Sequence, residues 1–174
     1  MFLALLAAAA LAAGGASPSP AMTPAAPATT TSSAPDFDYQ AADDRWTSLH
    51  EMRAGRAVML VFAPDPVTLA ELEADRAALE RRGITPVAVL DEPDGRAWRL
   101  AVRLGLHYSL LSDPRGTVAE AFGRWDGAHA TQGWCLVGHD GAVVAAGAGA
   151  HTAAELVATA TGLAGEAVPP TAAE

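Results

Sequence analysis

The stretch LGLHYSLLSDPRGTVAEAFG, residues 104–123, carries the strongest fold signal of the chain. Residues 109–111 form a short apolar run, typical of a buried strand in a parallel sheet. An Asp-Pro pair then predicts a helix start, with Asp113 as N-cap and Pro114 in the first helical position. Apolar residues follow at helical spacing, and Gly123 is placed to end the helix. The stretch therefore predicts one strand and one helix of an α/β domain.

The residues before this stretch repeat the alternation of strand and helix. Residues 58–62, VMLVF, predict a central buried strand, and residues 85–90, TPVAVL, predict a second one. Between them, Thr68 and Glu71 have the spacing of a capping box, with Thr68 as N-cap of a long helix. An acidic turn ending at Asp94 predicts the start of another helix.

The last third of the chain predicts a hairpin and a closing helix. Residues 133–137 and 142–146 flank a tight turn with an Asp-Gly pair, a strong hairpin signal. Residues 152–162 predict a final helix that opens with a capping box at Thr152. The order β-α-β-α-β-α-β-β-α predicts a thioredoxin-like α/β domain, in which helices flank a mixed central sheet.

Both ends of the chain are expected to lie outside this domain. Residues 1–16 have the apolar run and small residues of a signal peptide, and the run is shorter than the roughly 20 residues that span a bilayer. Residues 17–35 predict an uncharged Ala/Pro/Ser/Thr-rich linker, and residues 165–174 a flexible tail. The domain is expected over residues 36–164.

This organisation predicts an exported bacterial protein, periplasmic or secreted, without stable membrane insertion once the signal is cleaved. Whether the apolar segment is cleaved or kept as an anchor stays open. The net charge of −9 argues against nucleic acid as a partner. A protein or a small ligand remains as partner, and the sequence leaves the oligomeric state undetermined.

The single cysteine, Cys135, excludes an intrachain disulfide and a two-cysteine redox pair. It lies in an apolar run, where we expect a buried thiol with a raised pKa. The five histidines, His107 and His129 among them, show no spacing typical of a metal site, so no metal or other cofactor is expected. Trp125 follows a predicted helix and is expected to be an exposed contact residue for a partner.

Several segments resemble, in order and spacing, the peroxiredoxin-like redoxins of the alkyl hydroperoxide reductase and thiol-specific antioxidant group. They cover nearly all of residues 54–163 and read VMLVFAP, TPVAVL, LGLHYSLLSDPRGTVAEAFG and WCLVGHDGAVV. The resemblance implies a thioredoxin-like fold. It also implies peroxidase chemistry at a cysteine that begins the first long helix, where the helix N-terminus and an arginine lower the thiol pKa.

The family's motif has a proline, three residues, a threonine, two residues and then the peroxidatic cysteine. Reading from Pro64 places Glu71 at the cysteine position, whereas aligning the helix places Thr68 there, and both placements stay open. Counting back from the Asp-Gly turn places Gln132 where the family has its arginine. The resemblance therefore implies a degenerate member that lacks the peroxidatic cysteine and its arginine.

Two functions follow from this pattern. The first is a binding or envelope-associated accessory protein without peroxidase activity, a pseudoenzyme. The alternative is a thiol-dependent peroxidase or oxidoreductase, an antioxidant protein, that uses Cys135 at a position foreign to the family.

Overall fold

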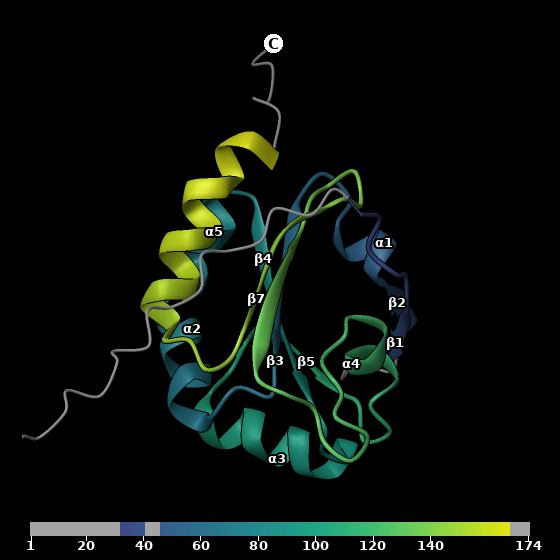
Figure 1. The fold of residues 1–174 in the computed structure, drawn as a ribbon. Coiled ribbons are helices and arrows are strands. Elements are labelled where there is room, and N and C mark those ends of the chain that lie inside the picture. The colour runs from purple at the N-terminus through teal and green to yellow at the C-terminus, as the bar shows by residue number, and fades with distance from the viewer. Residues whose placement is uncertain (1–31, 41–45, 168–174) are drawn as a thin grey trace, which may run out of the picture.

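The computed structural model describes residues 32–40 and 46–167, which form a five-stranded sheet between two layers of helices and loops (Figure 1). The sheet has the order β5-β4-β3-β6-β7. Its strands are β3 (Ala57–Phe62), β4 (Ile84–Leu90), β5 (Ser109–Ser112), β6 (Gly133–Val137) and β7 (Val143–Ala148). The longer helices are α2 (Pro66–Arg81), α3 (Asp94–Leu104) and α5 (Ala153–Ala167), and α4 (Thr117–Ala121) is short.

The order of strands follows from the connections between them. The strands β3, β4 and β5 are parallel, and right-handed crossovers in one direction place α2 and α3 on the same face of the sheet. The strand β6 pairs antiparallel with β3, and the hairpin returns as β7. The predicted thioredoxin-like mixed sheet is confirmed.

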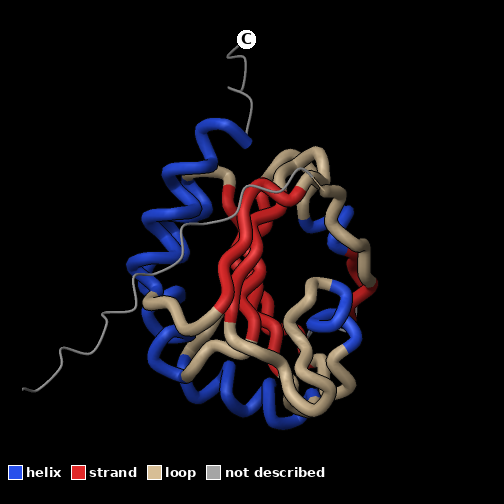
Figure 2. Tube along the Cα trace, viewed as in Figure 1, coloured by secondary structure: helices blue, strands red, loops and turns tan. Residues whose placement is uncertain are grey.

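The two faces of the sheet carry separate apolar cores, because successive side chains of a strand point to opposite sides. Met59 and Val61 of β3 pack with α2 and α5, together with Leu156. Leu60 and Phe62 pack on the opposite face, with α4 and the N-terminal segment. Figure 2 shows the sheet edge-on, with α2 and α5 on one side and loops with short helices on the other.

Three short elements precede β3 and were not predicted from the sequence. The strands β1 (Asp38–Gln40) and β2 (Trp46–Ser48) pair antiparallel, and α1 (Leu49–Met52) follows. Residues 32–35, predicted as linker, lie along the β6–β7 hairpin through hydrogen bonds that include Val143 N–H to the Ser32 carbonyl at 2.8 Å. These four residues therefore belong to the domain. The predicted signal peptide and the rest of the predicted linker lie outside the described residues.

Two of the predicted helix starts are wrong. The N-cap of α2 is Asp65, whose carboxylate accepts hydrogen bonds from the Val67 and Thr68 amides, so Thr68 lies inside the first turn. The N-cap of α4 is Gly116; Asp113 lies upstream and accepts a hydrogen bond from the Ala119 amide at 2.8 Å.

The predicted capping box of α5 is confirmed, because the Thr152 amide donates to Glu155 and the Glu155 amide donates to the Thr152 hydroxyl. The helix does not stop at residue 162 but continues to Ala167 and takes in the first residues of the predicted tail. Within the part of the chain that the structure describes, no helix has both the length and the apolarity needed to cross a membrane.

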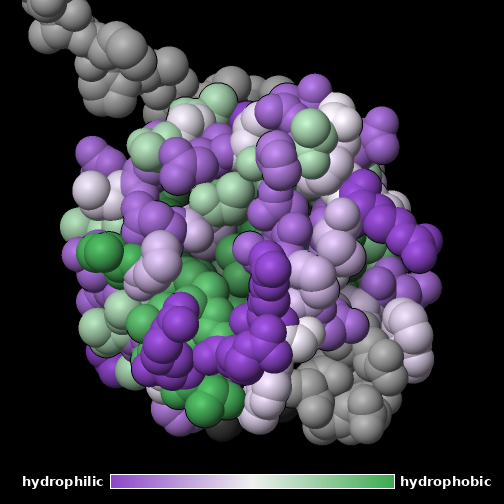
Figure 3. Space-filling view, turned by 90° about the horizontal axis from the view of Figure 1, so that it is seen from below, coloured by the Kyte–Doolittle hydropathy of each residue, from purple (hydrophilic) through white to green (hydrophobic). Residues whose placement is uncertain are grey.

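Helix α3 exposes part of its apolar surface. Leu100 and Leu104 pack on the core beside α2, whereas Trp98 and Val102 are 60% and 59% exposed. Figure 3 views the molecule from the side on which α3 lies in Figure 1 and shows apolar surface interrupted by strongly hydrophilic side chains. The helix is thus apolar over a wider arc than the core covers.

Candidate functional site

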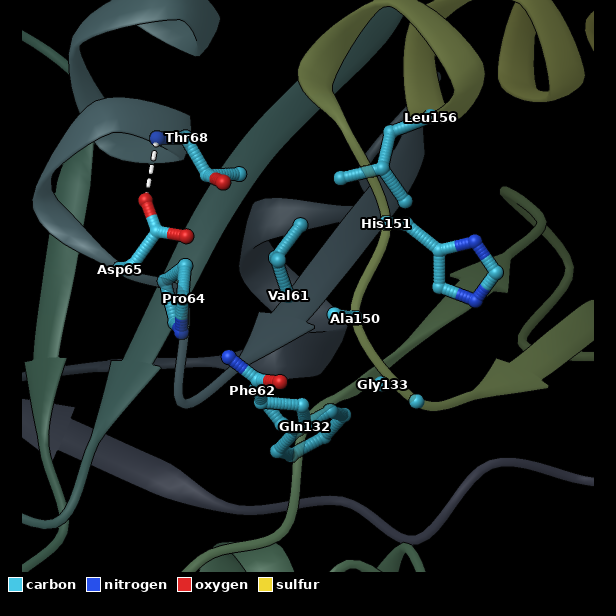
Figure 4. Close-up of a pocket in the computed structure, with 11 residues that line it drawn as sticks. Val61, Phe62, Pro64, Asp65, Thr68, Gln132, Gly133, Ala150, His151 and Leu156 are labelled. Carbon is cyan, nitrogen blue, oxygen red and sulfur yellow. Dashed lines mark hydrogen bonds between the residues drawn. The ribbon is translucent and has the colours of Figure 1, made fainter.

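A small pocket lies where the end of β3, the first turn of α2 and the loop before α5 meet (Figure 4). It brings together Thr68 and Gln132, which are far apart in sequence. Thr68 comes from the first turn of α2, and Gln132 directly precedes β6. The other lining residues are Val61, Phe62, Pro64, Asp65, Gly133, Gly149, Ala150, His151 and Leu156.

Asp65 and Thr68 form the polar side of this pocket. The Thr68 amide donates to Asp65 Oδ1 at 2.8 Å, the bond drawn in Figure 4. That bond, the Thr68 hydroxyl and the Val67 amide together hold the pKa of Asp65 below its ordinary value, against a smaller opposing effect of burial. Because Asp65 already carries a negative charge at the helix N-terminus, it satisfies the amides that would otherwise bind an anion.

The pocket has little free space. Buried Val61 and Leu156, 4% and 2% exposed, are among its lining residues, and a volume of about 20 Å³ remains. A water molecule needs roughly this much room, whereas an organic peroxide needs several times more. On the far side, the His151 ring packs edge-on against Trp134, with centroids 6.2 Å apart, and its Nε2 lies 3.2 Å from the Ala148 carbonyl.

The backbone that enters the pocket is strained. Ala63, between β3 and Pro64, has a φ of 45°, in the left-handed region that non-glycine residues avoid. Its amide is held by the Val89 carbonyl at 2.9 Å, and Pro64 follows directly. Strain of this kind persists where the surrounding structure enforces it.

Cys135 lies elsewhere, in the middle of β6 between Leu60 of β3 and Ala146 of β7. Its side chain belongs to the core on the α4 face and is 3% exposed, as expected from the sequence. Burial raises the pKa of the thiol to about 12, although the positive charge of Arg124 lowers it somewhat. The structure therefore does not bring Cys135 together with Thr68 and Gln132.

The remaining sequence candidates are also separate from the pocket. Glu71 is exposed and does not line it. His107 contacts Glu73 at 3.1 Å, and His129 contacts Asp91 at 3.1 Å, so each histidine has its own acidic neighbour. Over residues 32–40 and 46–167 the structure contains no cluster of three or more His, Cys, Asp or Glu side chains that could hold a metal ion.

Trp125 is not the exposed contact residue that the sequence predicts. It is half-buried against the core on the α4 face, and its ring lies over Gly116, where a Cβ would come within 2.2 Å of the ring. Gly116 has a φ of +68°, so a glycine is needed for both reasons. The contact depends on the tertiary fold and leaves no trace in the sequence around Trp125.

Two residues that the sequence reasoning missed matter here. Asp65 is followed by Pro66, and an Asp-Pro pair is itself a helix-start signal that could have identified the cap of α2. Arg124 gives no such signal, because its place beside Cys135 and Gly133 arises only from folding.

Comparison with known proteins agrees with this architecture. The sequence profile of the AhpC/TSA family matches residues 30–146. None of the curated proteins matches the chain. Similar solved structures include the peroxidoxin BcpB of Mycobacterium tuberculosis, with a TM-score of 0.69 and 17% identity, over 79% of this chain and 97% of that one.

Two further structures show the same fold. AhpC of Enterococcus faecalis has a TM-score of 0.67 and 21% identity, over 76% of this chain and 90% of that one. A reduced 2-Cys peroxiredoxin of Plasmodium vivax has a TM-score of 0.67 and 16% identity, over 80% and 98% of the two chains. With the profile match over more than half of its length, the chain belongs to the AhpC/TSA family.

Proposed function

We propose that this chain is an exported member of the AhpC/TSA family that has lost peroxidase activity and acts by binding, as an accessory protein of the cell envelope. One observation carries the proposal: the pocket at the start of α2 is lined by Thr68 and Gln132 and contains no thiol. In one of the two placements of the family motif, Thr68 stands at the position of the peroxidatic cysteine and Gln132 at that of the arginine, whereas the other placement puts Glu71 at the cysteine position.

Chemistry supports the loss of activity. Peroxide reduction needs a thiolate that attacks the O–O bond and becomes a sulfenic acid, which a thiol then reduces. The Thr68 hydroxyl has no comparable oxidised state, and a helix N-terminus does not bring its pKa near neutrality. In addition, the nearest charge is the Asp65 carboxylate, which disfavours a second anion.

The size of the pocket supports the same conclusion. About 20 Å³ accommodates no peroxide beyond the smallest, and buried Val61 and Leu156 line the pocket. The exposed Trp98 and Val102 of α3 are consistent with a role in binding, because apolar surface of this kind is commonly covered by partners.

The alternative is a thiol peroxidase that uses Cys135. It is favoured by one observation, that Cys135 lines a larger hollow of about 250 Å³ together with Arg124. Against it stands the pKa of about 12, which leaves very little thiolate at neutral pH.

Peroxide consumption with a thiol reductant separates the two proposals. We compare the native chain with Cys135→Ser, Thr68→Cys and Glu71→Cys. The binding proposal expects no turnover by the native chain or by Cys135→Ser. Turnover by the native chain that disappears in Cys135→Ser would refute it.

The two new cysteines test which register of the family motif is the right one. Activity restored by Thr68→Cys alone would place the lost cysteine at Thr68, and activity restored by Glu71→Cys alone would place it at Glu71. Export is tested separately, by fractionating an expressing bacterium and measuring the intact mass of the mature chain.

A further inference from the structure

The second hollow lies on the α4 face of the sheet, between the C-terminal end of α4, the β6–β7 pair and residues 32–35. It has a volume of about 250 Å³. Its lining residues are Ser32, Ser33, Pro35, Ala121, Phe122, Arg124, Cys135, Val143 and Ala146. No carboxylate is among them, and polar and apolar surface contribute about equally to the wall.

Arg124 is the single charged residue of this wall. Both backbone polar groups of Arg124 are hydrogen-bonded: its amide donates to the Ala119 carbonyl at 2.6 Å, and its carbonyl accepts from the Thr131 amide at 2.8 Å. The side chain runs over Gly133, where a Cβ would come within 2.9 Å of Arg124 Nε. Among residues 32–40 and 46–167, no acidic side chain pairs with its guanidinium.

The apolar part of the wall is partly aromatic. Phe122 packs against Phe62 with ring centroids 5.6 Å apart and edge-on against Phe37 at 6.3 Å. Val143 and Ala146 of β7 contribute aliphatic surface on the other side. A half-buried guanidinium that has no acidic partner within the described part of the chain, beside such a wall, is complementary to an anion with an apolar body.

We propose that this hollow binds a small monocarboxylate with an aromatic or branched aliphatic body, whose carboxylate pairs with Arg124 and whose body contacts Phe122 and Ala146. The volume sets the size: benzene occupies an engineered cavity of about 150 Å³, so 250 Å³ accommodates one ring with a short acid side chain. Guanidinium and carboxylate form paired, charge-assisted hydrogen bonds, which a neutral analogue cannot form.

This inference goes beyond the proposed loss of peroxidase activity and does not depend on it. Pocket and hollow share no lining residue. Peroxide turnover would refute the proposed function and leave ligand binding unaffected, and failure to bind an acid would refute the inference alone.

The test uses the full chain and two matched probes, 4-fluorophenylacetate and the neutral 4-fluorophenylacetamide, followed by ¹⁹F NMR line broadening and shift. We expect the acid to bind at least about 10-fold more tightly than the amide, a difference that corresponds to one charge-assisted contact. This comparison needs no variant, so it is independent of any effect of mutation on folding.

Three variants locate the binding. Arg124→Met should remove the preference for the acid while the amide binds as before, and Arg99→Met on exposed α3 is the charge-matched control. Ala146→Leu should fill the hollow and abolish binding of both probes. Circular dichroism and thermal unfolding verify that each variant is folded.

The inference is overturned by any of three results. These are equal affinities for acid and amide, acid binding that survives Arg124→Met, and absence of acid binding up to about 10 mM, beyond which affinity is negligible.

Discussion

The two hollows of this domain differ in whether their charged side chain is already paired within the protein and in how much free volume they contain. In the pocket at α2, Asp65 is hydrogen-bonded to Val67 and Thr68, and about 20 Å³ is free. In the hollow beside α4, Arg124 has no acidic partner among the residues described, and about 250 Å³ is free. The pocket at α2 therefore has almost no free volume, whereas the hollow on the opposite face is open.

The difference shows that two hollows of one fold can offer very different groups to a ligand. At the β3–α2 connection, directly after the strained Ala63 and Pro64, the Asp65 carboxylate satisfies amides of the helix N-terminus. Function has to be argued from the groups that line each hollow rather than from the family.

The largest expected effect concerns the Cys135 thiol. With a pKa of about 12 against an ordinary 9.0, labelling of the folded protein by a disulfide reagent at pH 8 should be about 10³-fold slower than in guanidinium chloride. The rate should rise about tenfold per pH unit, because only the thiolate reacts. A folded-state rate within tenfold of the unfolded rate would show that the hollow leaves Cys135 accessible and ionised.

Gly133 separates the two hollows, and its replacement should disturb both. In Gly133→Ala the new Cβ would lie 2.7 Å from the Gly147 carbonyl and 2.9 Å from Arg124 Nε. We expect a loss of about 2–3 kcal/mol in the free energy of unfolding, measured by urea denaturation, because a backbone atom has to move. Gly162→Ala is the control: nothing lies within 4 Å of its Cβ position in α5, so this variant should be neutral or slightly more stable.

Asp65→Ala should lower the free energy of unfolding by about 1 kcal/mol, the usual contribution of a helix N-cap, and Asp65→Asn should lower it by less. The folded-state pKa of Asp65 is lowered from 3.8, so its charge contributes stability that is complete above pH 3.8. That contribution is lost as the pH falls through the lowered pKa. Urea denaturation between pH 2.5 and 6, at roughly half-unit steps, should therefore show a steeper loss of stability on acidification for the native chain than for Asp65→Asn, in which the lowered pKa values of Glu73, Asp126 and Glu155 remain.

Ala63→Gly should give the smallest effect, an increase of roughly 0.5 kcal/mol in the free energy of unfolding. Glycine relieves the left-handed conformation at φ 45° but also increases the entropy of the unfolded chain. Thermal unfolding measures the gain. A loss of stability instead would mean that the surroundings of Ala63, and not its own conformation, determine the shape of this connection.

The central fold could be predicted because each signal was local. The apolar runs of β3 and β4, the Asp-Gly hairpin and the Thr152 capping box each lie within a few residues of sequence. The strands β1 and β2 are too short to show periodicity, so no sequence pattern predicts them. The start of α2 was misplaced because a capping-box spacing at Thr68 was preferred to the Asp-Pro pair before it.

The site was accessible to sequence reasoning only in part. Thr68 and Gln132 were named from the spacing of a resemblance, and the structure places both on one pocket. The hollow beside Cys135 could not be predicted, because it depends on Arg124, Ala146 and Ser32 meeting through the fold. The same holds for Trp125, whose burial requires Gly116 at a distance in sequence.

The way residues 32–35 are attached determines how the domain responds to a pulling force. The Ser32 carbonyl accepts from the Val143 amide and the Ala34 amide donates to the Gly141 carbonyl, each at 2.8 Å. A pulling force applied to the chain ahead of Ser32 would act on these two hydrogen bonds before it acts on the hydrogen bonds between strands of the central sheet. Ser32, Ser33 and Pro35 also line the hollow. A force that separates this segment from the β6–β7 hairpin would therefore open the hollow while β3, β4 and β6 stay folded.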